Sequence, residues 1–293
     1  MSIQKYIALL KVAELGSISL AAAQLGYSQP AISRMIADLE EDWQIDLLRR
    51  NRAGVTPSSE CLQLMPLLRA IEADCKALDF TISEFHGAQA GLVRVGIFTS
   101  VADMWIPRLL KSFQKKYPKI EFDLVNTNTY AEIEACIRQG KVDCGFVSLP
   151  TASDLDAYFL MRDELVAVLP TNHPLAKASE FPIQDLEGAP FIMLRERADY
   201  EVSHFLEHIP YTPVVKYEVG NEHTILSMVE CGLGISITHS LIADNPRYKV
   251  VHKRFDFGQH RDIAIAISKN ARVSRATQLF VDHVRTQFAK KKK

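Results

Sequence analysis

The stretch GYSQPAISRMIADLE, residues 26–40, predicts a helix with one apolar face and one unusually polar face. The apolar stripe comes from the i, i+3, i+4, i+7 spacing of Ile32, Met35, Ile36 and Leu39. The opposite side of the helix carries Gln29, Pro30, Ser33 and Arg34. Ser28 stands where an N-cap is expected, and Pro30 occupies the first turn, where its missing N–H costs least. The apolar face explains packing within the protein, so the polar face requires a partner outside it.

The residues before this stretch complete a helix-turn-helix pattern. One helix over residues 3–15 ends at Gly16, and a short helix capped by Ser17 or Ser19 ends at Gly26. In helix-turn-helix proteins the second helix lies in the major groove of DNA, with its first residues at the base edges. Gln pairs with adenine and Arg with guanine, while Ser reaches a base or a phosphate. The polar face is therefore expected to read DNA.

A basic hairpin is predicted directly after this helix, in the stretch DLLRRNRAGVT at residues 46–56. Its arginines, Arg49, Arg50 and Arg52, are placed to contact the phosphate backbone, which positions a protein without specifying sequence. The competing interpretation is that the polar face is an ordinary solvated helix surface. The N-cap, the proline, the apolar stripe and the basic hairpin all agree with DNA binding, so we prefer that interpretation.

Residues 58–86 predict a long helix with a heptad seam. Its apolar positions, separated alternately by three and four residues, are Cys61, Leu64, Leu68, Ile71, Cys75, Leu78, Ile82 and Phe85. A seam of this kind favours pairing with a second copy of the same helix. Pro66 is expected to kink the helix near its start. Residues 86–91 then break the pattern and are expected to serve as a hinge.

Strands and helices alternate along residues 92–293. The expected strands are 92–98, 121–127, 143–149, 164–170, 190–195, 213–219, 234–238 and 262–268. The expected helices are 101–117, 129–139, 200–208, 222–231 and 273–289. Apolar strands separated by helices indicate parallel sheets that are covered on both faces. Two such series, followed by a last helix, indicate two α/β lobes with crossovers near residues 160 and 265.

The composition is that of an ordinary folded protein, with 47% hydrophobic and 24% charged residues. The formal net charge of -1 does not decide whether the chain binds nucleic acid, because phosphate binding depends on a local basic patch. The first helix is interrupted by Lys5, Lys11 and Glu14, which argues against a signal peptide. No apolar run approaches the roughly 18 residues of a membrane span. We therefore expect a cytoplasmic protein with no membrane partner.

The sequence shows no motif for catalysis or for a cofactor. We find no GxSxG, HExxH, P-loop or paired-carboxylate pattern, which argues against an enzyme. The 5 cysteines form no CxxC pair, and none stands at zinc-ligand spacing with a histidine. We expect no catalytic residues, no metal site and no cofactor.

The stretch AELGSISLAAAQLGYSQPAISRMIADLEEDWQIDLLRR, residues 13–50, resembles the winged helix-turn-helix of the LysR-type transcriptional regulators. The stretch VECGLGISI, residues 229–237, resembles a second signature of that family. The resemblance implies that DNA is contacted by Ser28, Gln29, Pro30, Ser33, Arg34 and the wing arginines Arg49, Arg50 and Arg52. Two departures stand out. Residues 55–59 replace the family's usual Leu-Thr-x-x-Gly, and His239 stands where a proline is common.

The resemblance also implies an α+β multidomain fold. A winged helix-turn-helix domain would cover residues 1–57, a dimerising linker helix and hinge 58–90, and a two-lobed α/β periplasmic-binding-protein-like effector domain 91–293. Lobe I would span about 91–161 and 266–293, and lobe II about 162–265. The implied partners are double-stranded DNA with an inverted-repeat operator, a small-molecule effector, RNA polymerase and further copies of the chain, as a homodimer through the linker helix or a homotetramer.

Candidate effector contacts lie at the carboxyl ends of the strands, where open α/β sheets bind ligands. They are Thr99, Ser100, Asn128, Ser148, Arg195, Asn221 and His223. Thr99 and Ser100 also begin the following helix, so their hydroxyls and the free N–H groups would form an anion site. If Arg195 faces the cleft, it favours an anionic effector.

Each of these residues has a structural alternative. Thr99, Ser100 or Asn221 could simply cap a helix, His223 could be an ordinary surface residue, and Arg195 could pair with a nearby acid. Two functional alternatives also stay open. The first is a redox-responsive regulator using Cys136 and Cys144, although no flanking basic residue lowers their pKa. The second is a small-molecule-binding protein without DNA binding, which would have no use for the polar face of residues 26–40.

Overall fold

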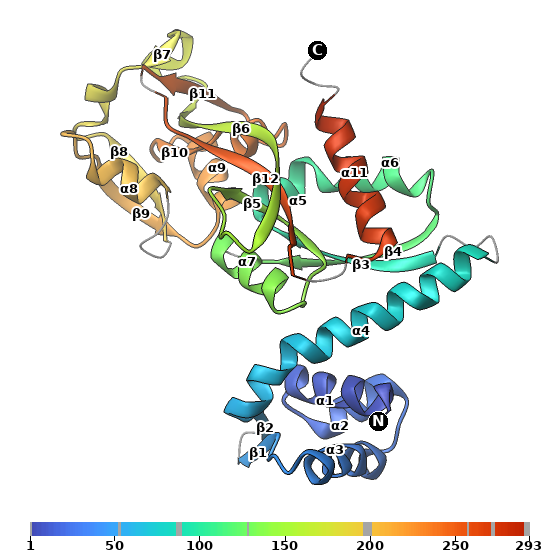
Figure 1. The fold of residues 1–293 in the computed structure, drawn as a ribbon. Coiled ribbons are helices and arrows are strands. Elements are labelled where there is room, and N and C mark those ends of the chain that lie inside the picture. The colour runs from blue at the N-terminus through green and yellow to red at the C-terminus, as the bar shows by residue number, and fades with distance from the viewer. Residues whose placement is uncertain are drawn as a thin grey trace.

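The structure, a computed structural model, describes residues 2–51, 54–85, 90–127, 129–195, 201–256, 258–270 and 273–289. Figure 1 shows a small head formed by helices and a hairpin, a long helix, and a larger mixed α/β part. The long helix leaves the head and passes along one side of the larger part.

The head begins with three helices, α1 (Ile3–Leu15), α2 (Ile18–Leu25) and α3 (Gln29–Trp43). The first two end where the sequence predicts, because Gly16 and Gly26 adopt φ of 63° and 71°, a left-handed conformation that favours glycine. Ser17 is the cap of α2, since its hydroxyl accepts the Leu20 N–H at 3.3 Å. The local turn signals in the sequence therefore fix the helix ends.

The apolar face of α3 builds the core of the head. Ile32, Ile36 and Leu39 are buried and Met35 is half-buried, which confirms the predicted stripe. The wing is an antiparallel hairpin of β1 (Leu48–Asn51) and β2 (Gly54–Pro57). Glu40 of α3 accepts the N–H groups of Leu47 and Leu48 at 2.8 and 3.1 Å. This carboxylate therefore fixes where the wing begins relative to the helix.

The long helix α4 (Ser59–Phe85) divides the predicted heptad seam between two environments. Cys61 and Leu68 are buried against the head, while Ile71, Leu78 and Ile82 are exposed. Leu67, which lies outside the predicted seam, is exposed as well. Leu67, Ile71, Leu78 and Ile82 are spaced 4, 7 and 4, so they still form a heptad-spaced apolar seam on the free side. Leu68 does not belong to that exposed seam, because the head already covers it.

The larger part contains one 8-stranded sheet in the order β4-β3-β5-β12-β6-β11-β7, with β10 paired to β6, and a second sheet of β8 and β9. The strands are β3 (Ala90–Ile97), β4 (Lys119–Asn126), β5 (Cys144–Leu149), β6 (Leu155–Pro170), β7 (Glu180–Phe181), β8 (Pro190–Leu194), β9 (Val214–Val219), β10 (Ser236–His239), β11 (Val250–Phe255) and β12 (His260–Ser268). β3 pairs parallel with β4 and β5, and β8 pairs parallel with β9.

The prediction of purely parallel sheets is wrong for the two longest strands. β6 and β12 pair antiparallel with each other, and β12 is also antiparallel to β5. The reason is that β6 carries the chain out of the first lobe and β12 brings it back. The sequence prediction also missed β7, β11 and the first half of β6.

The helices of this part are α5 (Thr99–Met104), α6 (Ile106–Gln114), α7 (Tyr130–Arg138), α8 (Glu201–Glu207), α9 (Glu222–Glu230), α10 (Ser240–Ala243) and α11 (Arg275–Ala289). Two short 3-10 turns, Pro174–Lys177 and Ile183–Leu186, complete the second lobe. The first core gathers around Phe113, Phe146 and Phe280. Ile263 to Ala266 belong to this first core.

Candidate DNA-binding surface and effector cleft

The polar face predicted for α3 is exposed at its amino half. Gln29, Pro30 and Arg34 are exposed and Ser33 is half-buried. Ser28 caps the helix, because its hydroxyl accepts the Ala31 N–H at 3.3 Å. An amide and a guanidinium are therefore exposed on the first two turns of α3, where base edges would be met.

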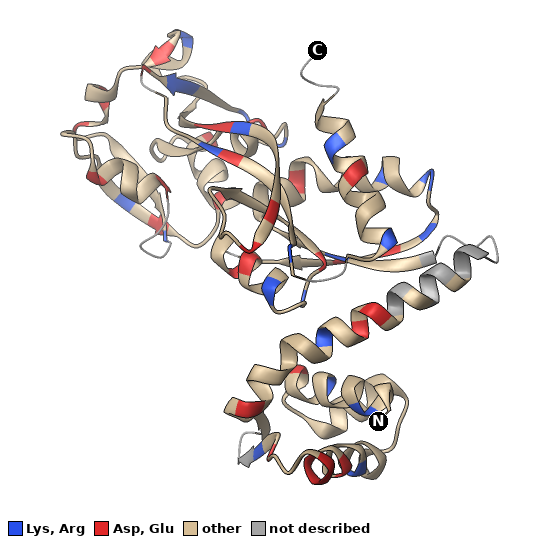
Figure 2. Cartoon of the chain, in the orientation of Figure 1, with Lys and Arg blue, Asp and Glu red and all other residues tan. Residues whose placement is uncertain are grey.

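Charge divides the head into two regions. The later turns of α3 carry Asp38, Glu40, Glu41 and Asp42, and Figure 2 shows red along this end of the helix and blue on part of β1. Arg49 on β1 is exposed. The side chain of Arg50 and the whole of Arg52 lie outside the described residues. The groups suited to phosphate are thus placed on the amino half of α3 and on the wing.

A second site lies where the two crossing strands meet. In the pairing of β6 with β12, Arg261 is opposite Asp163 and Asp262 is opposite Arg162. Because side chains alternate between the faces of a strand, the two pairs point in opposite directions. The Arg261–Asp163 pair is inside, with side chains 4% and 0% exposed. The Arg162–Asp262 pair is outside, with 57% and 26% exposed.

The buried carboxylate of Asp163 accepts hydrogen bonds on both oxygens. Its Oδ2 accepts from Nε of Arg261 at 3.0 Å and from Nη2 at 2.7 Å. Its Oδ1 accepts from the hydroxyl of Ser240 at 2.8 Å and from the N–H of Leu241 at 2.9 Å. Two N–H groups of Arg261 therefore converge on one oxygen, while the other oxygen is held at the start of α10, and these contacts compensate the cost of burying two charges.

Arg261 also reaches into the first lobe. It donates to the hydroxyl of Ser100 on α5 at 2.8 Å and to the hydroxyl of Tyr130 on α7. Its guanidinium carbon lies 4.8 Å from the centre of the Phe98 ring. Burial disfavours the charge, but the Tyr130 hydroxyl and the nearby carboxyl groups outweigh it and raise the pKa of Arg261. Arg261 thus joins β12 to β6, α5 and α7.

Two carboxyl groups at helix starts surround this pair. Burial raises the pKa of Glu222, the first residue of α9, to about 7, although the charge of Arg261 opposes the shift. Burial also raises the pKa of Glu201, the first residue of α8, against the charge of Arg261 and a hydrogen bond with Tyr130. The surroundings of Arg261 therefore hold more carboxyl groups than cations.

Strand β10 adds two buried polar side chains beside the crossing strands. Oγ1 of Thr238 is buried and has no hydrogen-bond partner among the residues that the structure describes. His239 is fully buried, and burial together with the charge of Arg261 holds the pKa of its imidazole well below the usual range. His239 is therefore neutral.

The two lobes are also joined by a histidine bridge. His223 of α9 places Nε2 2.8 Å from Oδ2 of Asp103 on α5. Its Nδ1 lies 3.0 Å from the hydroxyl of Tyr248. Since α5 belongs to the first lobe and α9 to the second, this bridge crosses the space between the lobes.

Two family models match the chain. The model of the LysR substrate binding domain matches residues 86–289, which is more than half of the chain. The model of the bacterial regulatory helix-turn-helix protein, lysR family, matches residues 3–62. The chain belongs to the LysR family of transcriptional regulators.

Individual relatives agree with this assignment. The probable HTH-type transcriptional regulator LrrA of Synechococcus elongatus is 31% identical over 245 residues, covering 83% of this chain and 82% of the relative. A full-length OxyR variant from Pseudomonas aeruginosa has the same fold, with a TM-score of 0.79, 19% identity and coverage of 97% and 95%. Full-length CbnR in complex with its target DNA has a TM-score of 0.66, 20% identity and coverage of 98% and 99%.

In this LysR-type regulator, four of the expected effector contacts have structural partners, one of them being His223 in its bridge to Asp103 and Tyr248. Ser100 is buried and accepts from Arg261. Asn221 caps α9, with Oδ1 accepting the N–H and hydroxyl of Thr224 at 2.8 and 3.0 Å. Arg195 is largely exposed, and its Nε lies 3.6 Å from Glu218. The cation that would have favoured an anionic effector therefore points to the surface.

The remaining expected contacts have different surroundings. Thr99 is the first residue of α5 and is half-buried, and the capping position belongs to Phe98, which makes no side-chain cap bond. Ser148 on β5 is half-buried, opposite Ile263 of β12. Asn128 lies outside the described residues.

The regulator's most buried cleft residues were missed from the sequence. Arg261 and Asp163 belong to short charged runs at the edge of otherwise apolar strands, in HRDIAIAIS and MRDELVAVLP. Such a charge is expensive to bury unless it is paired. That signal was present in the regulator's sequence, but it did not show that residues 98 positions apart are partners.

Among the described residues, no group of three His, Cys, Asp or Glu could hold a metal ion. Within the same part of the chain, no helix is long and apolar enough to cross a membrane.

Proposed function

We propose that this transcriptional regulator reads its operator through the amino half of α3. In this proposal Gln29, Ser33 and Arg34 contact base edges, while Ser28 and Pro30 set the first turn against the backbone. The wing residues Arg49, Arg50 and Arg52 contact phosphates. The observation that carries the proposal is the free amide and guanidinium on a face that the head does not use for packing. The same proposal has the protein act on DNA in the cytoplasm, without catalysis.

The test is the binding of Gln29→Ala to a selected operator fragment and to random DNA, measured by fluorescence anisotropy at one salt concentration. Loss of a base contact should reduce discrimination between the two by about 1–3 kcal/mol. Gln63→Ala is the matched control, because Gln63 is an exposed glutamine on α4, away from this face. Equal weakening on both DNAs would contradict base reading by Gln29.

We propose that the exposed seam of α4 pairs with the same seam of a second copy. Leu67, Ile71, Leu78 and Ile82 offer a heptad-spaced apolar stripe, which favours a parallel or antiparallel helix pair. A two-fold dimer presents two recognition helices, so its operator should contain an inverted repeat. Pairing of dimers into a homotetramer and contact with RNA polymerase extend this proposal. The functional division that follows is a DNA-binding unit at 1–57, a linker at 58–90 and an effector unit at 91–293.

We propose that the effector binds between the lobes, beside Glu222, Glu201 and Thr238. The expectation of an anionic effector is not supported by Arg195, which faces solvent, nor by Arg261, which is already paired. The groups near the crossing strands are the carboxyl groups of Glu222 and Glu201, the latter also hydrogen-bonded to Tyr130, and the hydroxyl of Thr238, which has no partner among the described residues. These groups suit a ligand that donates hydrogen bonds, such as an amine. Binding would compete with or reinforce the His223–Asp103 bridge and so shift the population of lobe orientations.

A panel of metabolites with and without amino groups, screened by thermal shift on the full chain, tests this ligand class. Hits should contain an amine and should lose affinity in Glu222→Gln. Hits confined to plain carboxylic acids, with unchanged affinity in that variant, would reject it.

The redox alternative has weaker support. Burial raises the pKa of Cys144 well above its usual value, and Cys136 is half-buried. A reactive sensor thiol requires a lowered pKa and access to solvent. Likeness to OxyR structures rests on the fold alone. Peroxide sensitivity of DNA binding that disappears in Cys136→Ser together with Cys144→Ser would restore this alternative.

A further inference from the structure

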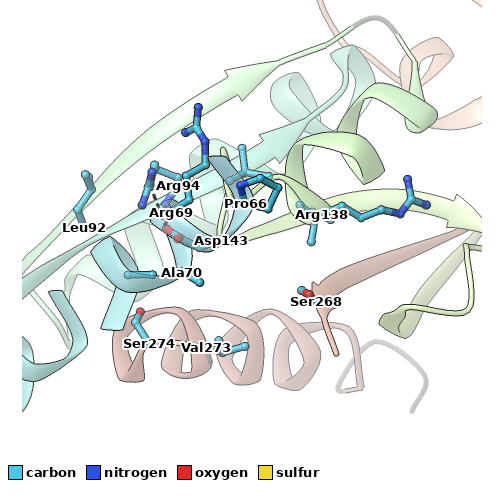
Figure 3. Close-up of a pocket in the computed structure, with 14 residues that line it drawn as sticks. Pro66, Arg69, Ala70, Leu92, Arg94, Arg138, Asp143, Ser268, Val273 and Ser274 are labelled. Atoms are coloured by element: carbon cyan, nitrogen blue, oxygen red, sulfur yellow. Dashed lines mark hydrogen bonds and ion pairs between the residues drawn. The ribbon is translucent and has the colours of Figure 1, made fainter. Parts of the chain in front are cut away.

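A small cavity lined by apolar and charged side chains lies at the junction of α4 with the first lobe. It has a volume of about 80 Å³, and Figure 3 shows its lining. α4 contributes Arg69, β3 contributes Arg94, and the segment before α11 contributes Ser274. The DNA-binding proposal and the effector proposal leave this cavity unused.

Arg69 is an unusual residue for a linker helix because it is only 8% exposed. Its Nε has no hydrogen-bond partner within the described part of the chain. Burial lowers the pKa of its guanidinium, with Glu14 and Glu72 opposing the shift and Arg94 adding to it. A buried donor without a partner is costly, so a native protein normally provides an acceptor for it.

Arg94 presents a second donor of the same kind. Its Nε is also buried without a hydrogen bond to any described residue. Asp143 accepts the backbone N–H of Arg94 at 2.7 Å, but its Oδ2 is 3.6 Å from the Nε of Arg94, too far for a hydrogen bond. In Figure 3 Arg69, Arg94 and Asp143 lie close together, while Arg138 extends away. Arg138 is held by Asp154 at 2.9 Å, so it does not supply the cavity's charge.

The amino end of α11 adds a third favourable element for an anion. Val273 and Ser274 line the cavity immediately before this 15-residue helix. The positive end of a helix dipole and its free N–H groups favour negative charge. The hydroxyl of Ser274 caps the helix by accepting the Thr277 N–H at 3.1 Å. Ser268 adds a second hydroxyl to the lining.

A glycine allows the helix to approach this closely. Gly140 follows α7 with φ of 63°, and a Cβ added there would lie 3.1 Å from Cβ of Arg69. Any other residue would therefore be strained and would push α4 away from the lobe. The junction between linker and lobe is thus shaped around the stem of Arg69.

We propose that this cavity is a second ligand site, which binds a small oxyanion such as phosphate or the phosphoryl group of a metabolite. The anion would accept from Nε of Arg69 and of Arg94 and face the amino end of α11. Because Arg69 belongs to the linker helix and Arg94 to the lobe, the bound anion clamps the two together. The ligand would thereby determine the orientation of the DNA-binding head relative to the effector lobes. This effect would be independent of any ligand in the cleft between those lobes.

The test is isothermal titration of the full chain with inorganic phosphate, at constant ionic strength against chloride. Phosphate should bind the unaltered protein, and Arg69→Gln should weaken that binding by about ten-fold or more. Glycerol 3-phosphate is the second probe. Comparable binding assigns the site to a phosphoryl group on a metabolite, and binding of phosphate alone assigns it to the free ion.

Phosphate could also bind the DNA-binding surface, so Arg49→Gln is the matched control and should keep the full affinity. Circular dichroism confirms folding of each variant, and Arg94→Gln replaces Arg69→Gln if the latter does not fold. Absence of phosphate binding to the unaltered chain would overturn the proposal. So would unchanged binding in the arginine variants of the cavity, or loss of binding in Arg49→Gln alone.

Discussion

Replacing Arg261 with glutamine is the most direct perturbation of the crossing strands. The change removes four hydrogen bonds, two to Asp163, one to Ser100 and one to Tyr130. It leaves the Asp163 carboxylate buried with only the donors from Ser240 and Leu241. Breaking a buried ion pair by removing one partner costs about 3–5 kcal/mol of the free energy of unfolding. We expect Arg261→Gln to lose stability in that range.

The neighbouring exposed pair provides the control. Arg162 and Asp262 lie on the same two strands, one position away, but on the outer face. Arg162→Gln should change stability far less than Arg261→Gln, because solvent screens an exposed pair. The two variants carry the same Arg→Gln change on the same pair of strands, so a difference in their stability reports the burial of the ion pair.

Urea unfolding followed by tryptophan fluorescence measures both variants. The chain has two tryptophans, and Trp43→Phe leaves Trp105, which is buried in the first core, as the reporter of the effector lobes. Replacing both partners, Arg261→Met with Asp163→Leu, should recover part of the loss, since the lone charge is gone. Similar midpoints for Arg261→Gln and Arg162→Gln would refute the reasoning, as would a double variant that is less stable than either single one.

Three further outcomes are expected. Ile71→Asp with Leu78→Asp should convert the dimer to monomer by analytical ultracentrifugation while the head stays folded by circular dichroism; a variant still dimeric would reject the exposed seam as the interface. Arg49→Ala should weaken binding to operator and random DNA alike and reduce the slope of log K against log salt by about 1; an unchanged slope would place Arg49 away from phosphate. Because burial raises the pKa of Glu222 to about 7, the folded state binds its proton more tightly than the unfolded state and loses stability as pH rises from about 4.5 to 7. The urea midpoint of Glu222→Gln should therefore rise relative to that of the unaltered protein as the pH increases from 5 to 8. A difference between the two midpoints that stays constant across that range would contradict the shift.

The head could be predicted closely from the sequence because its signals are local. A cap such as Ser28, a terminating Gly16 and a stripe at helical spacing each act within a few residues. Their agreement placed the carboxyl ends of α1 and α2 at Gly16 and Gly26, while the start of α2 stayed open between Ser17 and Ser19. The linker seam was less predictable, because heptad spacing alone does not show which stripe the head covers. Leu68 fits the spacing but packs inward, and Leu67 is exposed beside it.

The effector cleft could not be assembled from the sequence, because its contacts are long-range. The sequence showed that polar residues follow strands, but it did not show which of them were already used. Asn221 and Ser100 have partners within the protein. The pairing of Arg261 with Asp163 depends on the antiparallel register of β6 and β12, which a prediction of parallel sheets does not contain.

The two Arg-Asp dipeptides, 162–163 and 261–262, also determine which alignment of the crossing strands is allowed. In the native alignment each arginine faces an aspartate. A slip of one residue in one direction would place Arg261 opposite Arg162, and a slip in the other would place Asp262 opposite Asp163. Both errors bring like charges together across the strands, which is destabilising. The alignment is therefore determined by charge pairs where the strands meet, and it does not depend on the length of the second lobe inserted between them. Insertions in the surface loops of that lobe should consequently leave the cleft in place.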